Sequence, residues 1–471
     1  MNQDSGQQLS AANFSLRLIS FLDDVLHSAY LRCASYVCCG FFVCLLSLST
    51  ANAESPAKNP STSPLTSTST SPLSVSWPTF RGSDSTSVAD ASNLPKSWSE
   101  TSNIKWKSAI PGRGWSSPIV WGSTIWMTTA TPDGLEQSIV GVDLDSGATI
   151  CNELVFTNTS VQPDYDKSNS YASPTPTTDG ERLYVHYGAY GTACYDIQDR
   201  SHPKQLWQRR DLPCNHFRGA GSSPILFENA LIFHMDGFDF HYAIALNKLT
   251  GETLWKSDRN VDYDTDDGDK MKAFSTPLII HTKNRVQMIS PTAMAVLSLN
   301  PVDGSEYWRV RYKEHSSASR PVFDGERVYL NSGFSKGKLL AIDPNGSGDV
   351  TTDHVQWEAS RGIGCKPSPT VYRDWVFTVE DRGVVTCVAK ADGSIVWQKR
   401  VGGDFSASPL VADDHLFCFD ENGTGYVFEA NGSGTLVATN VLEDGCKASP
   451  IAVGRQMIVR TKSHLYCLEL K

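Results

Sequence analysis

The chain has 471 residues, of which 40% are hydrophobic and 20% are charged. This composition is typical of a globular protein and excludes collagen-like and wholly disordered classes. The 41 Lys and Arg residues are outnumbered by 51 Asp and Glu residues, and the sequence contains no run of basic residues. Nucleic acid is therefore not expected as a partner.

The N-terminal segment has the pattern of a secretory leader. Residues 34–48 are mostly apolar, follow Arg32, and precede the small-residue site Ala51-Asn52-Ala53. This pattern predicts a cleavable signal peptide over residues 1–53 and export to the cell envelope, such as the periplasm. A permanent anchor is the weaker alternative, because a spanning helix needs about 20 apolar residues. No leader cysteine follows a lipoprotein pattern.

Residues 54–76 are rich in Ser, Thr and Pro. A segment of this composition cannot bury an apolar core, so we predict a disordered tether. The tether could hold the remaining chain away from a membrane or wall, in a protein that we expect to be close to the membrane without spanning it.

The remaining chain is built from repeats. A proline opens a short apolar run eight times, at intervals of 40 to 56 residues: Pro118, Pro174, Pro224, Pro277, Pro321, Pro369, Pro409 and Pro450. This spacing is typical of one four-stranded propeller blade per unit. We predict an all-β fold, an eight-bladed β-propeller over residues 77–471.

The strands of a blade can be assigned from the alternation of apolar residues. Residues 409–420 contain two such runs around Asp413-Asp414, and residues 242–255 contain two more around a turn that ends at Gly251. The predicted outer strands carry a tryptophan, at Trp207, Trp255, Trp308, Trp357 and Trp397. We expect these rings to fill the gap between neighbouring sheets, in preference to stacking on a ligand.

The last blade lacks an outer strand, because the chain ends soon after Pro450. Residues 103–110 carry Trp106 and precede Pro118 much as Trp397 precedes Pro409. We therefore expect this N-terminal strand to complete the last blade and close the ring, which removes exposed strand edges.

Eight cysteines follow the leader. Cys194, Cys387 and Cys467 occupy the third-strand position that Ala245 holds in another repeat, so they are expected to be small buried residues. Cys365 and Cys446 also match each other, but a whole blade separates them. Free thiols are favoured over disulfides.

The loops that lead into the inner strands should cluster at one mouth of the channel. They carry an unusual number of cations and aromatic rings: Arg113, Trp115, Tyr171, Arg218, Lys272, Phe274, His315, Arg320, Arg361, Lys366, Phe405 and Lys447. Such a mouth could bind a small anionic or sugar-like ligand. The alternative, which we favour, is that these side chains cap the channel and pair with loop carboxylates.

A second candidate site is the loop with Asp262, Asp264, Asp266, Asp267 and Asp269. Oxygen-rich loops can hold Ca²⁺. The spacing differs from an EF-hand loop, and a solvated acidic loop is the preferred interpretation. The chain contains no motif of a known hydrolase, zinc protease or P-loop enzyme.

The repeats ALNKLTGETLW, CVAKADGSIVW and SLNPVDGSEYW resemble the pyrroloquinoline-quinone-type propeller repeat over residues 77–471. WPTFRG, HFRGAGSSPI and KAFSTP are similar to exported propellers of planctomycete-like bacteria. Two better understood families share the repeat. The quinoprotein alcohol dehydrogenases imply pyrroloquinoline quinone (PQQ) and Ca²⁺, and the propeller lipoprotein of outer-membrane protein assembly implies docking without catalysis.

The dehydrogenase resemblance implies adjacent cysteines that hold the quinone, but the only such pair, Cys38 and Cys39, lies in the leader. Trp115 could imitate the stacking residue of those enzymes. We expect a monomeric, non-catalytic propeller that binds an envelope protein or a small anionic or sugar-like ligand and needs no cofactor. The alternatives are a PQQ-dependent oxidoreductase, with Ca²⁺, and a glycan-binding protein.

Overall fold

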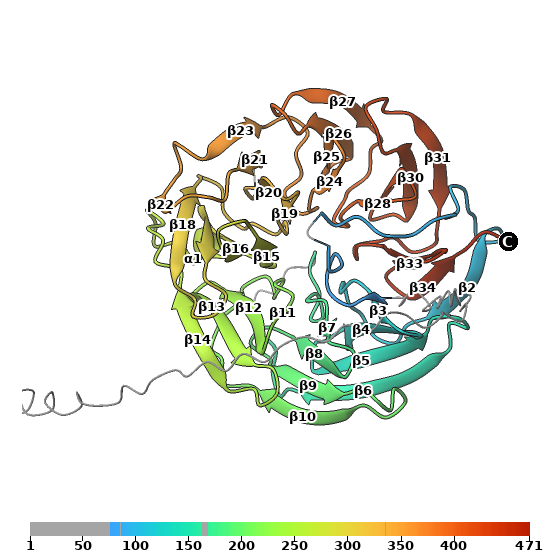
Figure 1. The fold of residues 1–471 in the computed structure, drawn as a ribbon. Helices are drawn as coiled ribbons and strands as arrows, with labels where there is room; N and C mark the ends of the chain where they lie inside the picture. Colours follow the sequence, from blue (N-terminus) through green and yellow to red (C-terminus); the bar gives the residue numbers. More distant parts are fainter. Residues whose placement is uncertain (1–75, 85, 163–167, 335) are drawn as a thin grey trace, which may run out of the picture. The chain divides into compact units, whose positions relative to one another are not determined.

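The computed structural model describes residues 76–471 except 85, 163–167 and 335. The predicted signal peptide, its cysteines and all of the predicted tether except Ser76 lie outside the described residues. The strands of the described chain form eight sheets around a central axis (Figure 1). The prediction of an eight-bladed propeller is confirmed.

The first four blades are numbered in chain order. Blade 1 contains β1 (Ser76–Trp77), β3 (Ile119–Trp121), β4 (Thr124–Ala130), β5 (Glu136–Asp143) and β6 (Thr149–Thr157). Blade 2 contains β7 (Thr177–Thr178), β8 (Arg182–His186), β9 (Thr192–Asp196) and β10 (Lys204–Arg209). Blade 3 contains β11 (Ile225–Phe227), β12 (Ala230–Asp236), β13 (His241–Asn247) and β14 (Thr253–Asp258). Blade 4 contains β15 (Leu278–His281), β16 (Val286–Thr292), β17 (Ala295–Leu299), β18 (Glu306–Arg311) and the added β22 (Gly348–Asp349).

The other four blades follow the same order. Blade 5 contains β19 (Val322–Phe323), β20 (Val328–Asn331), β21 (Leu339–Ile342) and β23 (Val355–Ala359). Blade 6 contains β24 (Thr370–Tyr372), β25 (Trp375–Glu380), β26 (Val384–Ala389) and β27 (Ile395–Arg400). Blade 7 contains β28 (Leu410–Ala412), β29 (His415–Phe419), β30 (Thr424–Glu429) and β31 (Leu436–Val441). Blade 8 contains β32 (Ile451–Val453), β33 (Gln456–Arg460), β34 (His464–Leu468) and β2 (Ile104–Ala109).

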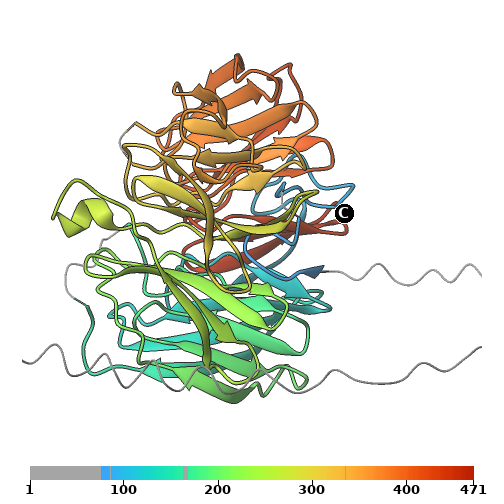
Figure 2. The ribbon, with the colours of Figure 1, turned by 60° about the vertical axis from the view of Figure 1, so that its left-hand side comes forward.

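The helix α1 (Gly268–Met271) lies between blades 3 and 4 and projects from one face of the ring (Figure 2). Among the described residues, no helix has the length and apolar character needed to cross a membrane.

The ring is closed as the sequence predicts. β2 pairs antiparallel with β34, which places Trp106 opposite Cys467. The Trp106 indole N–H donates to the carbonyl of Leu144 in blade 1, at 3.1 Å. Arg460 of blade 8 adds buried bonds to blade 1, from its Nη1 to Ser116 Oγ at 2.6 Å and to Thr128 O at 3.0 Å. Segments near both ends of the described chain therefore hold the same interface.

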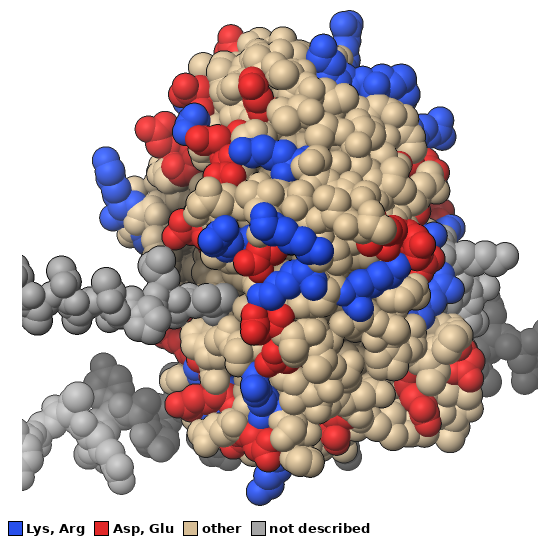
Figure 3. Space-filling model, turned by 90° about the vertical axis from the view of Figure 1, so that its right-hand side faces the viewer, with Lys and Arg blue, Asp and Glu red and all other residues tan. Residues whose placement is uncertain are grey.

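Ion pairs cover this closure on the outside. Lys105 of β2 pairs with Asp145 and Glu469, and Lys107 pairs with Glu100 and Glu443. The side of the ring that carries β2 and the C-terminus shows Lys and Arg side chains interspersed with Asp and Glu (Figure 3). Because such surface pairs contribute little each, the buried contacts carry most of the closure.

Tryptophans on the outer strands join each blade to the next. The indole N–H of each donates to a backbone carbonyl in the turn between the third and outer strands of the following blade: Trp207 to Lys248 (3.0 Å), Trp255 to Pro301 (3.1 Å), Trp308 to Pro344 (2.9 Å), Trp357 to Lys390 (3.0 Å) and Trp397 to Asn431 (3.0 Å). A glycine in most of these turns, such as Gly251, lies against the ring. The rings therefore fasten blades together, as expected.

The cysteine prediction is confirmed for the third strands. Cys194, Cys387 and Cys467 are buried free thiols. Each is the direct cross-strand partner of an outer-strand tryptophan, namely Trp207, Trp397 and Trp106. Ala245 holds the same position opposite Trp255. A small side chain is needed there because the large ring occupies the neighbouring position.

A ring of hydrogen bonds, here called the hydroxyl ring, surrounds the channel at the start of the inner strands. The residue before the strand-opening proline donates its backbone N–H to a hydroxyl of the next blade: Ser117 to Thr175, Thr175 to Ser223, Ser223 to Thr276, Arg320 to Ser368, Ser368 to Ser408, Ser408 to Ser449, and Ser449 to Ser117, at 2.9 to 3.1 Å. In blade 2 the equivalent proline is Pro176, because β7 begins at Thr177. The prediction that Pro174 opens the inner strand of this blade is therefore wrong.

We expect Trp106→Ala to lower the free energy of unfolding by about 3 kcal/mol, because the substitution leaves a cavity at the ring closure. Chemical denaturation with a single global probe measures this loss. Leu154→Ala, on the outer strand β6, is the control, since Leu154 is 48% exposed. Equal losses in the two variants would contradict a special role for the closure.

The buried thiols should resist alkylation. Burial raises the pKa of Cys194, Cys387 and Cys467 to about 12. Because the thiolate is the reactive form, iodoacetamide at about pH 8 should modify them only after unfolding. Mass spectrometry of native and denatured samples measures this, and rapid labelling of the native protein would contradict it.

Candidate functional site

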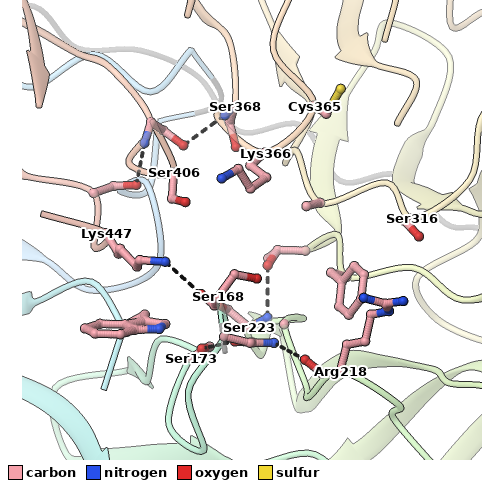
Figure 4. A pocket seen from close by; sticks show the side chains of 18 of the residues that line it. Ser168, Ser173, Arg218, Ser223, Ser316, Cys365, Lys366, Ser368, Ser406 and Lys447 are labelled. Carbon is pink, nitrogen blue, oxygen red and sulfur yellow. Dashed lines mark hydrogen bonds between the residues drawn. The ribbon is translucent and has the colours of Figure 1, made fainter. Parts of the chain in front are cut away.

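The channel opens at one end into a cavity of about 390 Å³, here called the mouth pocket. Its walls come from the loops that lead into the inner strands of all eight blades. The pocket is also lined by side chains of the hydroxyl ring, including Ser117, Ser223, Ser368 and Ser449. Hydroxyl groups therefore line the pocket on several sides, among aromatic rings such as Trp115 and Phe274, and Ser223 and Ser368 are seen at the cavity in Figure 4.

The pocket has a floor made by the start of the described chain. β1 pairs with β3 on the inner edge of blade 1, and the following residues cross the channel. The axial segment, residues 76–84 and 86–92, bonds to Thr178 in blade 2, Val371 in blade 6, Val411 in blade 7 and Gly454 in blade 8. Phe80 of this segment lines the mouth pocket. A ligand therefore enters a blind pocket rather than an open channel.

One cation cluster lies beside blades 6 to 8. The Glu421 carboxylate accepts from Lys366 Nζ at 3.2 Å and pairs with Lys447 Nζ at 3.0 Å. Lys447 also donates to the Ser168 carbonyl at 3.1 Å (Figure 4). Burial would raise the pKa of Glu421, but the Ser406 hydroxyl and the two ammonium groups outweigh it and lower that pKa. Glu421 is thus a carboxylate held between two lysines.

A second cluster lies beside blades 3 to 5. Lys272, whose side chain is almost fully buried, bonds the Asp269 carboxylate and donates to Ser316 Oγ at 3.1 Å. Arg218 Nε reaches the same carboxylate at 3.3 Å. Burial lowers the pKa of Lys272, and Asp269 only partly offsets this effect. Burial, and then the charge of Lys272, also lower the pKa of His315.

The charge of the pocket is positive on balance. Arg218, Lys272, Lys366 and Lys447 line the cavity, while Asp269 and Glu421 each serve two of these cations. Asp381 also lies 3.9 Å from Lys366, so three carboxylates face four cations and leave an excess of one positive charge. In a chain with a net charge of −10, this is a local reversal of sign.

The aromatic rings of the mouth are in contact with cations. The Arg113 guanidinium lies 5.0 Å and the Lys447 ammonium 5.6 Å from the Trp115 ring centre. Lys272 lies 5.5 Å from the Phe274 ring centre. These rings therefore position cations, and ligand stacking on Trp115 would compete with them.

The structure brings together most of the mouth residues predicted from the sequence. Trp115, Arg218, Lys272, Phe274, His315, Lys366 and Lys447 line the mouth pocket. Arg113 lies behind Trp115, and Tyr171 packs on Gly134 and Tyr190. Arg361 is exposed, and Phe405 is buried beside Tyr426. Arg320 lines a different cavity, because its long side chain turns along the axis.

Sequence reasoning missed Phe80, Glu421 and the hydroxyl ring. The hydroxyl ring had a signal, since Ser or Thr precedes most of the strand-opening prolines. Glu421 had none, because it lies in the loop after β29 and reaches the mouth only in the folded blade.

The acidic loop is divided among several roles. Asp267 caps α1 and pairs with Lys270, Asp262 accepts the backbone N–H of Asp264, and Asp269 belongs to the pocket. Within the described residues, no three His, Cys, Asp or Glu side chains form a group that could hold a metal ion. Calcium binding by this loop stays a prediction that the geometry does not support.

A family model described as "Outer membrane protein assembly factor BamB" matches residues 239–351 and 346–470. The chain belongs to the PQQ-type β-propeller family. No curated protein matches the sequence.

Solved structures share the fold at low identity. BamB from Moraxella catarrhalis is 11% identical with a TM-score of 0.56, over 78% of this chain and 97% of that chain. A europium-containing methanol dehydrogenase is 12% identical with a TM-score of 0.57, over 82% and 89%. A quinohemoprotein alcohol dehydrogenase from Comamonas testosteroni is 10% identical with a TM-score of 0.59, over 84% and 81%. These likenesses concern the fold alone.

Proposed function

We propose that this propeller is an exported docking protein that holds an acidic segment of an envelope partner protein in its mouth pocket, without catalysis. The observation that carries the proposal is the convergence of Arg218, Lys272, Lys366 and Lys447 on one blind cavity. Electrostatic complementarity of this kind steers an oppositely charged partner and selects against others.

Asp269 and Glu421 indicate how a partner carboxylate would be held. Each accepts bonds from two cations, and a ligand carboxylate could join either cluster or displace its internal carboxylate. The Trp115 indole N–H is buried without a partner and is a further donor beside the pocket. Charge-assisted bonds of this type are about twice as strong as neutral ones.

The rival dehydrogenase function needs a site for PQQ and a metal ion. The carboxylate that lines the pocket, Asp269, is already bonded to Lys272 and Arg218. The Trp115 ring is in contact with two cations. These residues do not fit a quinone stacked over a carboxylate-bound metal ion, so the proposal includes no cofactor.

Export and a docking role have independent support. The N-terminal sequence has the pattern of a signal peptide, and the matching family model is named for an assembly factor of the outer membrane. A monomer with one mouth pocket suffices for docking. A glycan ligand is the weaker candidate, because the aromatic faces it would use already contact cations.

The test is a titration of the purified protein with a short glutamate-rich peptide, followed by tryptophan fluorescence. We expect saturable binding that weakens with salt, and a loss of at least about tenfold in affinity in the double variant Lys366→Gln, Lys447→Gln. Glu421→Gln should strengthen binding, because it removes the internal competitor of both lysines.

The matched control is Lys204→Gln, Lys399→Gln, which removes the same charge from exposed positions on outer strands. A lysine-rich peptide of equal length controls for the sign of the charge. Equal losses in the two double variants would sink the proposal. Saturable binding of PQQ with Ca²⁺ and dye-linked alcohol oxidation would replace it with the dehydrogenase, and binding of cell-wall polysaccharide in place of the peptide would replace it with the glycan alternative.

A further inference from the structure

A second cavity of about 220 Å³, here called the axial cavity, lies among the inner strands away from the mouth. Inner strands of blades 2 to 4 form one wall, including Thr178, Leu226 and Leu278. The axial segment forms another wall through Thr79 and Ser83. Arg320 of blade 5 also lines the cavity. Ser83 is exposed, so solvent reaches this cavity.

Arg320 occupies the position where the hydroxyl ring is interrupted. At this position the other blades carry Ser or Thr, whose hydroxyl accepts from the preceding blade. The bond from Thr276 has no counterpart, because residue 320 offers no hydroxyl. The arginine therefore costs the ring one hydrogen bond in addition to its own desolvation.

The positive charge of Arg320 is buried beside that of Arg81. Both side chains are 4% exposed, and no carboxylate of the described residues forms an ion pair with either. Asp84 acts on Arg320 from a distance, but its Oδ1 already accepts from the N–H and the hydroxyl of Thr86. Uncompensated buried charge of this kind destabilises a fold unless an opposite charge is bound.

Burial lowers the pKa values of both arginines. Burial lowers the pKa of Arg320 to about 10, an effect that Asp84 partly offsets. Burial and the charge of Arg320 lower the pKa of Arg81 to about 9. Both guanidinium groups therefore remain charged at neutral pH.

Polar atoms at the axial cavity lack partners. Arg320 donates from Nη1 to Ser87 Oγ at 3.3 Å, while its Nε is buried with no hydrogen bond. The Thr79 hydroxyl, on the wall formed by the axial segment, is likewise buried and unbonded. The Nε edge of a guanidinium is one of the two edges that bind an oxyanion through two parallel hydrogen bonds.

Arg81 differs from Arg320 in the bonding of its Nη atoms, although its Nε is also buried with no hydrogen bond. Its Nη atoms donate to the carbonyls of Pro409 and Pro369 at 2.6 and 2.8 Å, and it adopts a left-handed φ of 65°. Arg81 therefore fastens the axial segment to blades 6 and 7. Its charge is then a fixed contribution to the positive potential around the axis.

We propose that the axial cavity binds a small oxyanion, held by the Arg320 guanidinium and the Thr79 hydroxyl and stabilised by the charge of Arg81. Inorganic phosphate, sulfate and a simple carboxylate share this chemistry. The bound anion would join the axial segment to blade 5, so it would stabilise the closed floor of the mouth pocket.

The test measures thermal unfolding of the purified protein in increasing inorganic phosphate, with ionic strength held constant by sodium chloride. We expect a saturable rise in Tm, because an anion that binds only the folded state stabilises it. Arg320→Ser should remove this rise while the fold is kept, since serine restores the missing link of the hydroxyl ring. Thr79→Val should weaken the response while keeping the size of the side chain.

Sulfate and acetate, used in place of phosphate, identify the preferred oxyanion. The mouth variant Lys366→Gln, Lys447→Gln should keep the part of the phosphate response that Arg320→Ser removes, which separates this site from the mouth pocket. An equal rise in Arg320→Ser would show a general salt effect and overturn the proposal. A wild-type protein with no phosphate response would also overturn it. The role of Arg320 would then be limited to its hydrogen bond with Ser87.

Discussion

The closed ring depends on the pairing of β2 with β34, because this pairing places a strand between the last blade and the first. The N-terminal strand supplies the outer strand of blade 8 and repeats the tryptophan contact of the other blades, from Trp106 to the Leu144 carbonyl. Arg460 seals the same junction from inside, through Ser116 and Thr128. With β2 in place, the third strand β34 of blade 8 no longer presents an unpaired outer edge on which another chain could pair.

The rotational repeat explains both what the sequence could predict and where prediction failed. Contacts that recur in every blade leave recurring residues, so the tryptophans, their small partners such as Cys387, and the closing role of Trp106 were predictable. Contacts made once leave no repeat. Glu421 is close to Lys366 and Lys447 only through the curvature of three blades, and the crossing of Phe80 beneath the mouth depends on the path of a single segment.

Misplaced mouth residues have a related cause. The sequence locates a residue before an inner strand but does not tell whether its side chain follows the loop outward or the axis inward. Lys447 points into the pocket beside Trp115, whereas Arg361 remains exposed and Arg320 turns toward Ser87. The position of a residue before an inner strand therefore predicted which end of the channel it lies near. The length and packing of its side chain decided the direction in which that side chain points.

The repeat also distinguishes structural side chains from functional ones along the axis. A side chain that repeats from blade to blade, such as the hydroxyl of Ser368, is explained by the ring itself. A side chain that departs from the repeat at a cost in hydrogen bonding or burial needs another explanation. Lys272, almost fully buried at the mouth, and Arg320, buried at the axis, are departures of this kind, and both place positive charge where the propeller has no structural need for it. The proposed anion recognition at two levels of one channel would account for both.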